Sequence, residues 1–397
     1  MENLRSDPGI LDVAILGGGP AGTAVALEAH RLGLSVAVWE RDRFPRGKVC
    51  GEFISSEARP ILEEEIPGTV ARGAEIRSAQ FITNHGMSRT FRLPRPALGL
   101  SRHLLDAALW KACVAAGIEV HEGELVHRVR PPVLSSRQRG TWAIETATGN
   151  ARTSRSLIVA CGRWWAIEGL PSPALQAAPQ VPGDWIGAKA HFAGIPSLDR
   201  VEMYFFRGGY CGLAPVEDGE CNACCLMRRE RVREKGTKGF EDFAAWLVQA
   251  AHLPQLETRL RAADQISPVV STAPVHLARR QAVQSGAIMV GDASGFLDPF
   301  TGEGISMALH SGRLAAQAEA KSLSEGAGDE RAAAIYQQCL SQAVGRSYWV
   351  ASIARSLFHG PLWLQGMATA PLPWIGGRLV NATRWREDPG GKPRSTG

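Results

Sequence analysis

The stretch Leu11-Asp12-Val13-Ala14-Ile15-Leu16-Gly17-Gly18-Gly19-Pro20-Ala21-Gly22 decides the fold of this chain. Its apolar first half predicts a buried strand, and its glycines predict a tight turn into a helix. A second strand is expected at residues 35–39 and ends in Glu40. The turn would let a pyrophosphate approach the helix N-terminus, and the Glu40 carboxylate would accept the hydroxyls of an adenine ribose. The stretch therefore predicts a dinucleotide-binding βαβ unit. We assign its cofactor contacts to Gly17, Gly19, Pro20, Ala21, Gly22 and Glu40.

The composition is that of a folded protein larger than one average domain. The chain has 397 residues, of which 45% are hydrophobic and 21% are charged, and its net charge is +5. These values predict two lobes with a sizeable core, and the mild, scattered charge argues against binding to nucleic acid. No apolar run reaches 18 residues, and residues 1–8 do not form a signal sequence. We therefore expect neither a membrane span nor export.

The eight cysteines lack the regular pairing of a disulfide-rich domain. Their spacing predicts free thiols and a reduced, cytoplasmic location. The group Cys221-x-x-Cys224-Cys225 lies in an apolar run without a second pair of ligands. We expect these cysteines to be buried in a strand, and we expect no metal site.

A second diagnostic block begins with an apolar strand at residues 287–290 and ends that strand in Gly291-Asp292. The Asp292 carboxylate would bind a ribityl hydroxyl. A Pro-x-x-Gly-x-Gly loop at residues 299–304 then opens a helix expected at 305–320, whose N-terminus would stabilise negative charge on a reduced flavin. The two blocks together predict FAD as the cofactor. The contacts expected from this block are Gly291, Asp292, Pro299, Gly302, Gly304 and Ile305.

The order of the expected elements predicts an α/β fold with two intertwined domains. Residues 9–70, 97–170 and 270–344 are assigned to a discontinuous Rossmann-type FAD-binding domain. Residues 71–96 and 171–269 are assigned to an inserted antiparallel-sheet substrate domain, because alternating strands with turn residues dominate there. The aromatic-rich residues 345–386 are expected to form a helical C-terminal region, and residues 387–397 a disordered tail.

Three further segments resemble one known superfamily of flavoproteins. They are Phe44-Pro45-Arg46-Gly47-Lys48-Val49-Cys50-Gly51-Glu52, Ala160-Cys161-Gly162-Arg163-Trp164, and Cys211-Gly212-Leu213-Ala214-Pro215 with Asn222. The superfamily contains p-hydroxybenzoate-hydroxylase-type monooxygenases, flavin-dependent halogenases and geranylgeranyl-reductase-type enzymes, and these segments are most similar to the reductase branch. The resemblance implies that Arg102 lies against the FAD phosphates or ribityl chain, and that the backbone of Val126 meets the adenine.

Four residues near these motifs have more than one interpretation each. Arg41 would stack on the adenine or form a surface salt bridge. Lys48 would neutralise phosphate or polarise a substrate oxygen, or would be an exposed lysine. Cys50 would line the pocket, which we favour, or act in redox chemistry. Glu52 would donate a proton or merely cap a turn. Lys48, Cys50 and Glu52 are thus the candidate catalytic residues.

The sequence departs from two branches of the superfamily. Aromatic hydroxylases carry an Asp-Gly element where this chain has Gly162-Arg163-Trp164-Trp165, and the Trp-x-Trp-x-Ile-Pro element and transfer lysine of the halogenases have no match. The resemblance therefore favours hydride transfer through flavin N5, to reduce or desaturate a carbon–carbon bond of a hydrophobic isoprenoid or polyketide-like molecule.

Monooxygenation through a C4a-hydroperoxide is the main alternative, and a non-catalytic flavin-binding module is a remote one. The electron donor is left open among NADPH, reduced flavin and a redox protein. The C-terminal aromatic residues would pack over the sheet or form a lid, which we favour, or would make a peripheral membrane contact.

Overall fold

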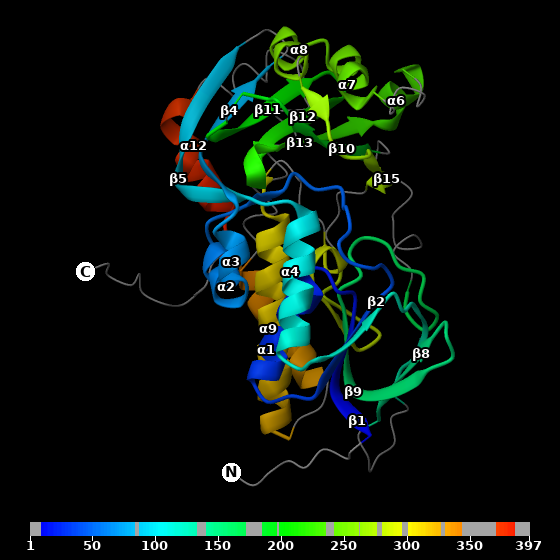
Figure 1. The fold of residues 1–397 in the computed structure, drawn as a ribbon. Coiled ribbons are helices and arrows are strands. Elements are labelled where there is room, and N and C mark those ends of the chain that lie inside the picture. The colour runs from blue at the N-terminus through cyan, green and yellow to red at the C-terminus, as the bar shows by residue number, and fades with distance from the viewer. Residues whose placement is uncertain are drawn as a thin grey trace, which may run out of the picture.

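The computed structural model describes residues 9–83, 87–132, 140–171, 185–196, 198–235, 242–261, 263–275, 280–295, 301–326, 330–343 and 371–385. Two lobes stand one above the other in Figure 1, each built on its own sheet. The predicted Pro299 contact, most of the aromatic C-terminal region and the predicted tail lie outside the described residues. Within the described part of the chain, no helix is long and apolar enough to cross a bilayer.

The first lobe is an eight-stranded sheet with the strand order β16-β17-β9-β1-β2-β6, to which β8 and β7 are added at β9. Its parallel strands are β1 (Ile10–Leu16), β2 (Val36–Glu40), β6 (Glu119–Glu122), β9 (Ala151–Val159) and β17 (Ala287–Met289). β7 (Val126–Arg130), β8 (Trp142–Thr146) and β16 (Val283–Gln284) pair antiparallel. β2 is buried along its whole length, as expected for a parallel strand covered on both faces.

Three long helices pack together beside this sheet and point toward the second lobe (Figure 1). They are α1 (Pro20–Arg31), α4 (Arg102–Ala115) and α9 (Gly304–Ser324). α1 begins with Pro20 in its first turn, where the fixed φ of proline suits a helix, and small residues allow α1 and α9 to approach closely. At Gly312, for example, an added Cβ would lie 2.5 Å from the carbonyl oxygen of Ala21. Two shorter helices, α2 (Arg59–Glu65) and α3 (Pro67–Val70), lie beside this group.

The second lobe is a nine-stranded sheet with the order β14-β10-β13-β12-β11-β4-β5-β3, and β15 pairs with β10. All its pairings are antiparallel except β11 with β4. The strands are β3 (Phe53–Ile54), β4 (Ala74–Ile82), β5 (Ser88–Gly99), β10 (Trp185–Ala193), β11 (Arg200–Phe206), β12 (Gly209–Pro215), β13 (Cys221–Arg228), β14 (Asp264–Gln265) and β15 (Val270–Val275).

Helices cover the outer face of this sheet and one of its ends (Figure 1). α6 (Arg229–Lys235), α7 (Phe243–Ala251) and α8 (Pro254–Leu260) lie on the face away from the first lobe, and α12 (Leu372–Thr383) packs along β5. The opposite, inner face of the second sheet therefore faces the first lobe.

The structure confirms the predicted α/β fold class. Three segments that the sequence assigned to the FAD-binding domain pair instead within the second sheet: residues 53–54 with β5, residues 97–99 with β3 and β4, and residues 270–275 with β10. The chain passes between lobes at these points, and short crossing segments carry too few residues to show a period of their own. All eight cysteines are free.

Candidate active site

A cavity of about 590 Å³ lies between the two lobes. One end is lined by the glycine turn after β1, and the other by side chains from the inner face of the second sheet and from α12. The cavity therefore joins the two regions that the sequence assigned to the cofactor and to the substrate.

The glycine turn has the shape that a pyrophosphate site requires. Gly17 adopts φ +108°, a backbone conformation that favours glycine, and an added Cβ at Gly22 would lie 1.8 Å from the carbonyl oxygen of Gly17. At Gly19, by contrast, the nearest atoms to an added Cβ are guanidinium nitrogens of Arg102 and Arg46, at 3.8 and 3.9 Å. Gly17 and Gly22 are thus needed for close packing of the turn, whereas Gly19 leaves open space at the N-terminus of α1. Pro20 and Ala21 also line the cavity there.

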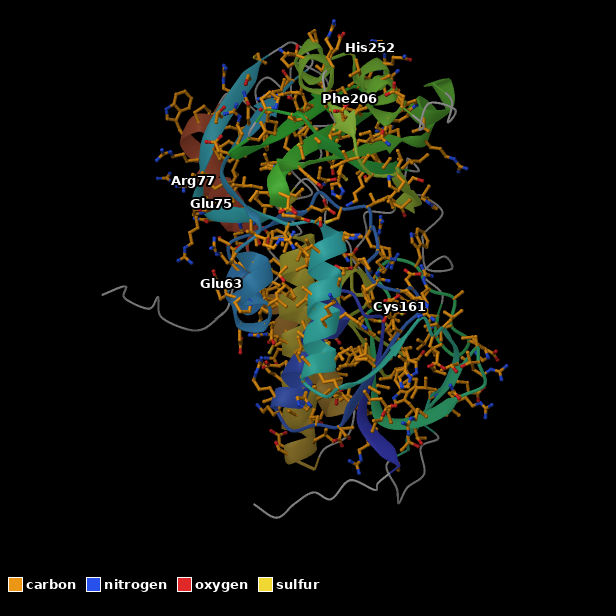
Figure 2. All side chains as sticks on the ribbon, viewed as in Figure 1. Glu63, Glu75, Arg77, Cys161, Phe206 and His252 are labelled. Carbon is orange, nitrogen blue, oxygen red and sulfur yellow. The ribbon has the colours of Figure 1, made fainter. Side chains whose placement is uncertain are left out.

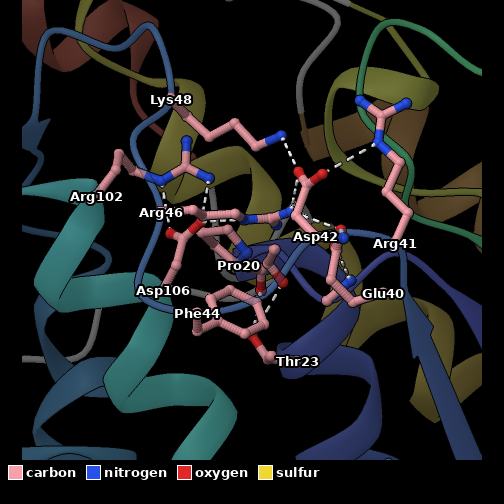
Figure 3. A network of polar contacts seen from close by, with 12 residues as sticks. Pro20, Thr23, Glu40, Arg41, Asp42, Phe44, Arg46, Lys48, Arg102 and Asp106 are labelled. Atoms are coloured by element: carbon pink, nitrogen blue, oxygen red, sulfur yellow. Dashed lines mark hydrogen bonds and ion pairs between the residues drawn. The ribbon is translucent and has the colours of Figure 1, made fainter. Parts of the chain in front are cut away.

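Two arginines face this open space (Figure 3). Arg102 sits in the first turn of α4 and binds Asp106 through Nε and Nη2, at 2.6 and 2.7 Å. Arg46 binds Glu40 at 2.6 Å and Asp42 at 2.8 Å, while its buried Nε makes no hydrogen bond. Two fixed cations and an unused donor beside a helix N-terminus suit a pyrophosphate.

Glu40 ends β2 as predicted and is already bound by the protein. Its Oε2 accepts the N–H of Gly18 at 2.8 Å, and its Oε1 accepts the N–H of Asp42 at 2.9 Å and the Arg46 guanidinium. A carboxylate accepts about four hydrogen bonds, so one position remains for a ribose hydroxyl. Arg41 lines the same end of the cavity but is exposed, with its Nε 3.6 Å from Asp42. The structure thus shows the surface ion pair that was one of two interpretations of Arg41.

The second predicted block reaches the same cavity beside the glycine turn, where an added Cβ at Gly291 would lie 3.0 Å from Ala21 Cβ. Gly291 (φ +57°) follows β17, and Asp292 lines the cavity. Burial raises the pKa of Asp292, while the guanidinium groups of Arg163, Arg102 and Arg280 act in the opposite direction. Gly302, Gly304 and Ile305 line the cavity at the N-terminus of α9, and Val126 lines it at the start of β7. The described members of the predicted cofactor set therefore line one cavity, except Gly22 and Gly291, which do not line it.

The predicted catalytic loop crosses this cavity, but its three side chains differ in their surroundings. Lys48 donates to Asp42 at 2.8 Å and so points toward the glycine-turn end (Figure 3). Cys50 lines the cavity, and burial raises the pKa of its thiol, which fits a lining role better than redox chemistry. Glu52 is fully buried at φ +56°, a strained conformation for a residue with a side chain.

Glu52 is the centre of a buried charge cluster that sequence reasoning did not find. Lys189 Nζ donates to Glu52 Oε1, and His191 Nε2 lies 2.6 Å from Glu52 Oε2. The backbone N–H of Arg102 also donates to Oε1, at 2.8 Å. Burial favours the neutral acid, but His191 and Lys189 outweigh it and lower the pKa of Glu52. The group is therefore a carboxylate at neutral pH, which does not suit the predicted role of proton donor.

The cluster joins the loop to the second sheet. Lys189 and His191 are on β10, where Lys189 pairs with Cys224 of β13 and His191 pairs with Asn222. Asn222 donates to the carbonyl oxygen of Cys50 at 2.9 Å. Alternating polar residues in an otherwise apolar strand were the available signal, because only one face of that strand meets the covering helices.

The far end of the cavity is apolar. It is lined by Phe81, Phe91, Leu93, Val201, Met203 and Val380, which come from β4, β5, β11 and α12. Arg384, directly after α12, also lines it, and its guanidinium contacts the carboxyl groups of Glu57 and Glu303. An apolar molecule would therefore lose contact with water in this chamber without leaving a charge unpaired.

The described residues fit FAD on these observations. The glycine turn has room at Gly19, arginines with an unused donor face that room, and the two predicted acids, Glu40 and Asp292, both line the cavity. The cavity continues from there into the apolar chamber, so a flavin ring would lie between the glycine turn and the substrate wall.

Comparisons with known proteins agree with this interpretation. No family model matches the chain. Conditioned medium factor receptor 1 of Dictyostelium discoideum is 26% identical, and the match covers 89% of this chain and 71% of that protein. Digeranylgeranylglycerophospholipid reductase 2 of Methanothermobacter thermautotrophicus is 25% identical, covering 85% of this chain and 84% of the reductase. A solved flavin-dependent brominase, a triple mutant, has a TM-score of 0.75 at 19% identity and covers 96% of both chains. The flavin dependence and FAD content of such relatives confirm the predicted cofactor.

Proposed function

Because this chain belongs to the FAD-dependent flavoprotein superfamily of geranylgeranyl-reductase-type enzymes and flavin-dependent halogenases, we propose that it reduces or desaturates a carbon–carbon bond of an apolar small molecule. FAD, when bound, supplies the hydride chemistry at N5. The observation that carries the proposal is the continuous cavity from the glycine turn to the apolar chamber.

The protein's own residues hold the two molecules and exclude water. Gly19, Arg46 and Arg102 bind the pyrophosphate, while Glu40 and Asp292 bind ribose and ribityl hydroxyls. The apolar wall at Phe81 and Phe91 binds the substrate through its surface rather than through a reactive side chain. We assign Glu52 as a positioning residue, because its carboxylate holds the loop at residues 48–52 and the first turn of α4.

The lysines favour this chemistry over halogenation, which in the superfamily uses a lysine to transfer hypohalous acid. Lys48 is the one lysine among the described residues that line the cavity. Its ammonium binds Asp42, away from the apolar chamber. Lys189 lies behind the loop and binds Glu52. Neither lysine presents an unpaired amine to the substrate.

Anaerobic single turnover tests the proposal. The FAD-loaded protein is reduced with dithionite, mixed with a panel of isoprenoid and polyene substrates, and followed by flavin absorbance and product mass. We expect reoxidation of the flavin without oxygen and a product two hydrogens heavier. Turnover that needs oxygen and places ¹⁸O from labelled O₂ in the product would replace the proposal with monooxygenation. A halogenated product formed with oxygen and halide would replace it with halogenation.

A further inference from the structure

The outer side of α12 and β5 exposes apolar surface that is unusual for this molecule. Trp374 is 80% exposed and Leu379 is 42% exposed, and they are two of six large hydrophobic residues exposed in the described part of the chain. α12 buries Leu372 and Gly376 instead, with Gly376 seated against the ring of Phe91 on β5. The helix therefore has an inner face that packs on the sheet and an outer face with a bare tryptophan.

The two elements are also basic. β5 carries Arg89, Arg92 and Arg95, and α12 carries Arg378, while neither element contains an acidic residue. None of the four guanidinium groups forms an ion pair with the described residues. On the neighbouring β4, by contrast, Arg77 is paired with Glu75 at 2.9 Å, beside α12 (Figure 2).

The two elements that carry these groups are in direct contact. The backbone of Gly377, next to Arg378, packs over β5, where an added Cβ would lie 3.6 Å from the carbonyl oxygen of Arg92 and 3.7 Å from Pro94. An exposed tryptophan on α12, with arginines on α12 and on the strand it packs against, matches the interfacial zone of an anionic bilayer. The charges attract the surface, and the indole enters the headgroup layer.

These elements also form the wall of the apolar chamber. Phe91 and Leu93 of β5 and Val380 of α12 line the cavity from inside, directly behind the basic outer face. A protein held on a bilayer by this face would have its chamber wall against the lipid. An apolar substrate could then pass between lipid and chamber with little exposure to water.

We infer that the outer face of α12 and β5, marked by Trp374, Leu379, Arg92, Arg95 and Arg378, docks on an anionic lipid surface and receives the substrate there. The statement that the molecule received from the lipid is an apolar substrate rests on the proposed function. The docking itself rests only on the exposed side chains.

Vesicle flotation with the full FAD-loaded chain tests the docking. We expect binding to phosphatidylcholine vesicles that contain about one third phosphatidylglycerol, weak binding without it, and release in high salt. The double variant Arg92→Gln/Arg95→Gln should bind about 25-fold more weakly, at about 5-fold per charge. Trp374→Ala should weaken binding about 10-fold, because the indole would no longer be buried in the headgroup layer of the bilayer.

Matched controls come from the exposed side of α4. Val114→Ser and Lys111→Gln remove an exposed apolar group and an exposed charge there, and both should bind vesicles as the parent does. Equal binding with and without phosphatidylglycerol, or equal losses in the α4 variants, would overturn the inference. Equal affinity for DNA at the same salt, lost in the same arginine variants, would overturn it in favour of a general polyanion site.

The same preparations separate this inference from the proposed function. If the protein binds FAD and turns over substrate in detergent but does not bind the vesicles, the docking inference fails and the proposed function stands. If it binds vesicles through Trp374 and the arginines but reduces no apolar substrate, the docking stands and the proposed function fails.

Discussion

Replacing Lys189 with methionine tests whether the buried cluster at Glu52 carries real charge. The side chains of Lys189 and Glu52 are 3% and 0% exposed. If one ion were removed, water could therefore not reach the other ion to solvate it. Breaking such a pair from one side costs about 3–5 kcal/mol, because it leaves an uncompensated buried charge. His191 and the N–H of Arg102 would still bind the carboxylate. We therefore expect Lys189→Met to lower the free energy of unfolding by about 3 kcal/mol.

The rescue variant makes this prediction specific. Lys189→Met/Glu52→Gln removes both charges, and replacing a buried pair as a whole is often close to neutral. We expect the double variant to recover at least half of the loss. The control is Arg261→Met, which breaks an i,i+4 pair with Glu257 whose side chains are 74% and 45% exposed, and which should cost less than about 0.5 kcal/mol.

Urea unfolding followed by circular dichroism, with and without added FAD, measures the parent and these variants, together with Glu52→Gln alone. If Lys189→Met costs no more than Arg261→Met, the Glu52 carboxylate is not an uncompensated ion and the reasoning about the cluster is refuted. A double variant that loses as much as the sum of the two single variants would refute it as well, because the partners would then act independently.

Three further predictions concern the cavity. Gly22→Ala should abolish FAD binding and destabilise the fold, because its Cβ would lie 1.8 Å from Gly17 O; Gly19→Ala should leave circular dichroism unchanged yet weaken FAD binding, as a fluorescence titration would show. Glu52→Gln should keep FAD and slow turnover less than about 10-fold, whereas a loss of about 100-fold or more would restore its role as a proton donor. Burial raises the pKa of Glu303 to about 8, so its contribution to stability is present below its ordinary pKa and lost as pH rises through about 8; relative to Glu303→Gln, the parent should lose stability in urea titrations between about pH 5 and pH 9.

The local parts of the site could be predicted from the sequence, because their physics is local. A turn in which Gly22 must touch Gly17 requires glycine at a fixed spacing, and an acid at the end of β2 must follow a short helix and strand. The same holds for the strand that ends at Gly291-Asp292 and for the glycine loop that opens α9. These motifs give the position of each contact along the chain, and the parallel sheet then brings the ends of the strands together.

The charge cluster could not be predicted in this way. Lys189 and His191 lie 137 and 139 residues after Glu52, and only the pairing of β10 in the second sheet brings them to the loop. A lysine within an apolar strand predicts only that one face is polar. Which carboxylate it binds depends on where the chain crosses between lobes, and nothing in the sequence of β3, the end of β5 or β15 tells which of the two sheets each segment joins.

The N-terminus of α4 explains why the cofactor and substrate ends of the cavity are held together. Two buried carboxylates from outside the helix bind it: Glu52 accepts the N–H of Arg102, and Glu217, between β12 and β13, accepts the N–H and hydroxyl of Ser101. Anions at this end of a helix are stabilised by its dipole and satisfy donors that would otherwise be unpaired. The guanidinium of Arg102 faces the glycine turn at the same time. A displacement of the second sheet would therefore pull directly on the residue placed to bind the pyrophosphate, which gives the two lobes a physical reason to move as one.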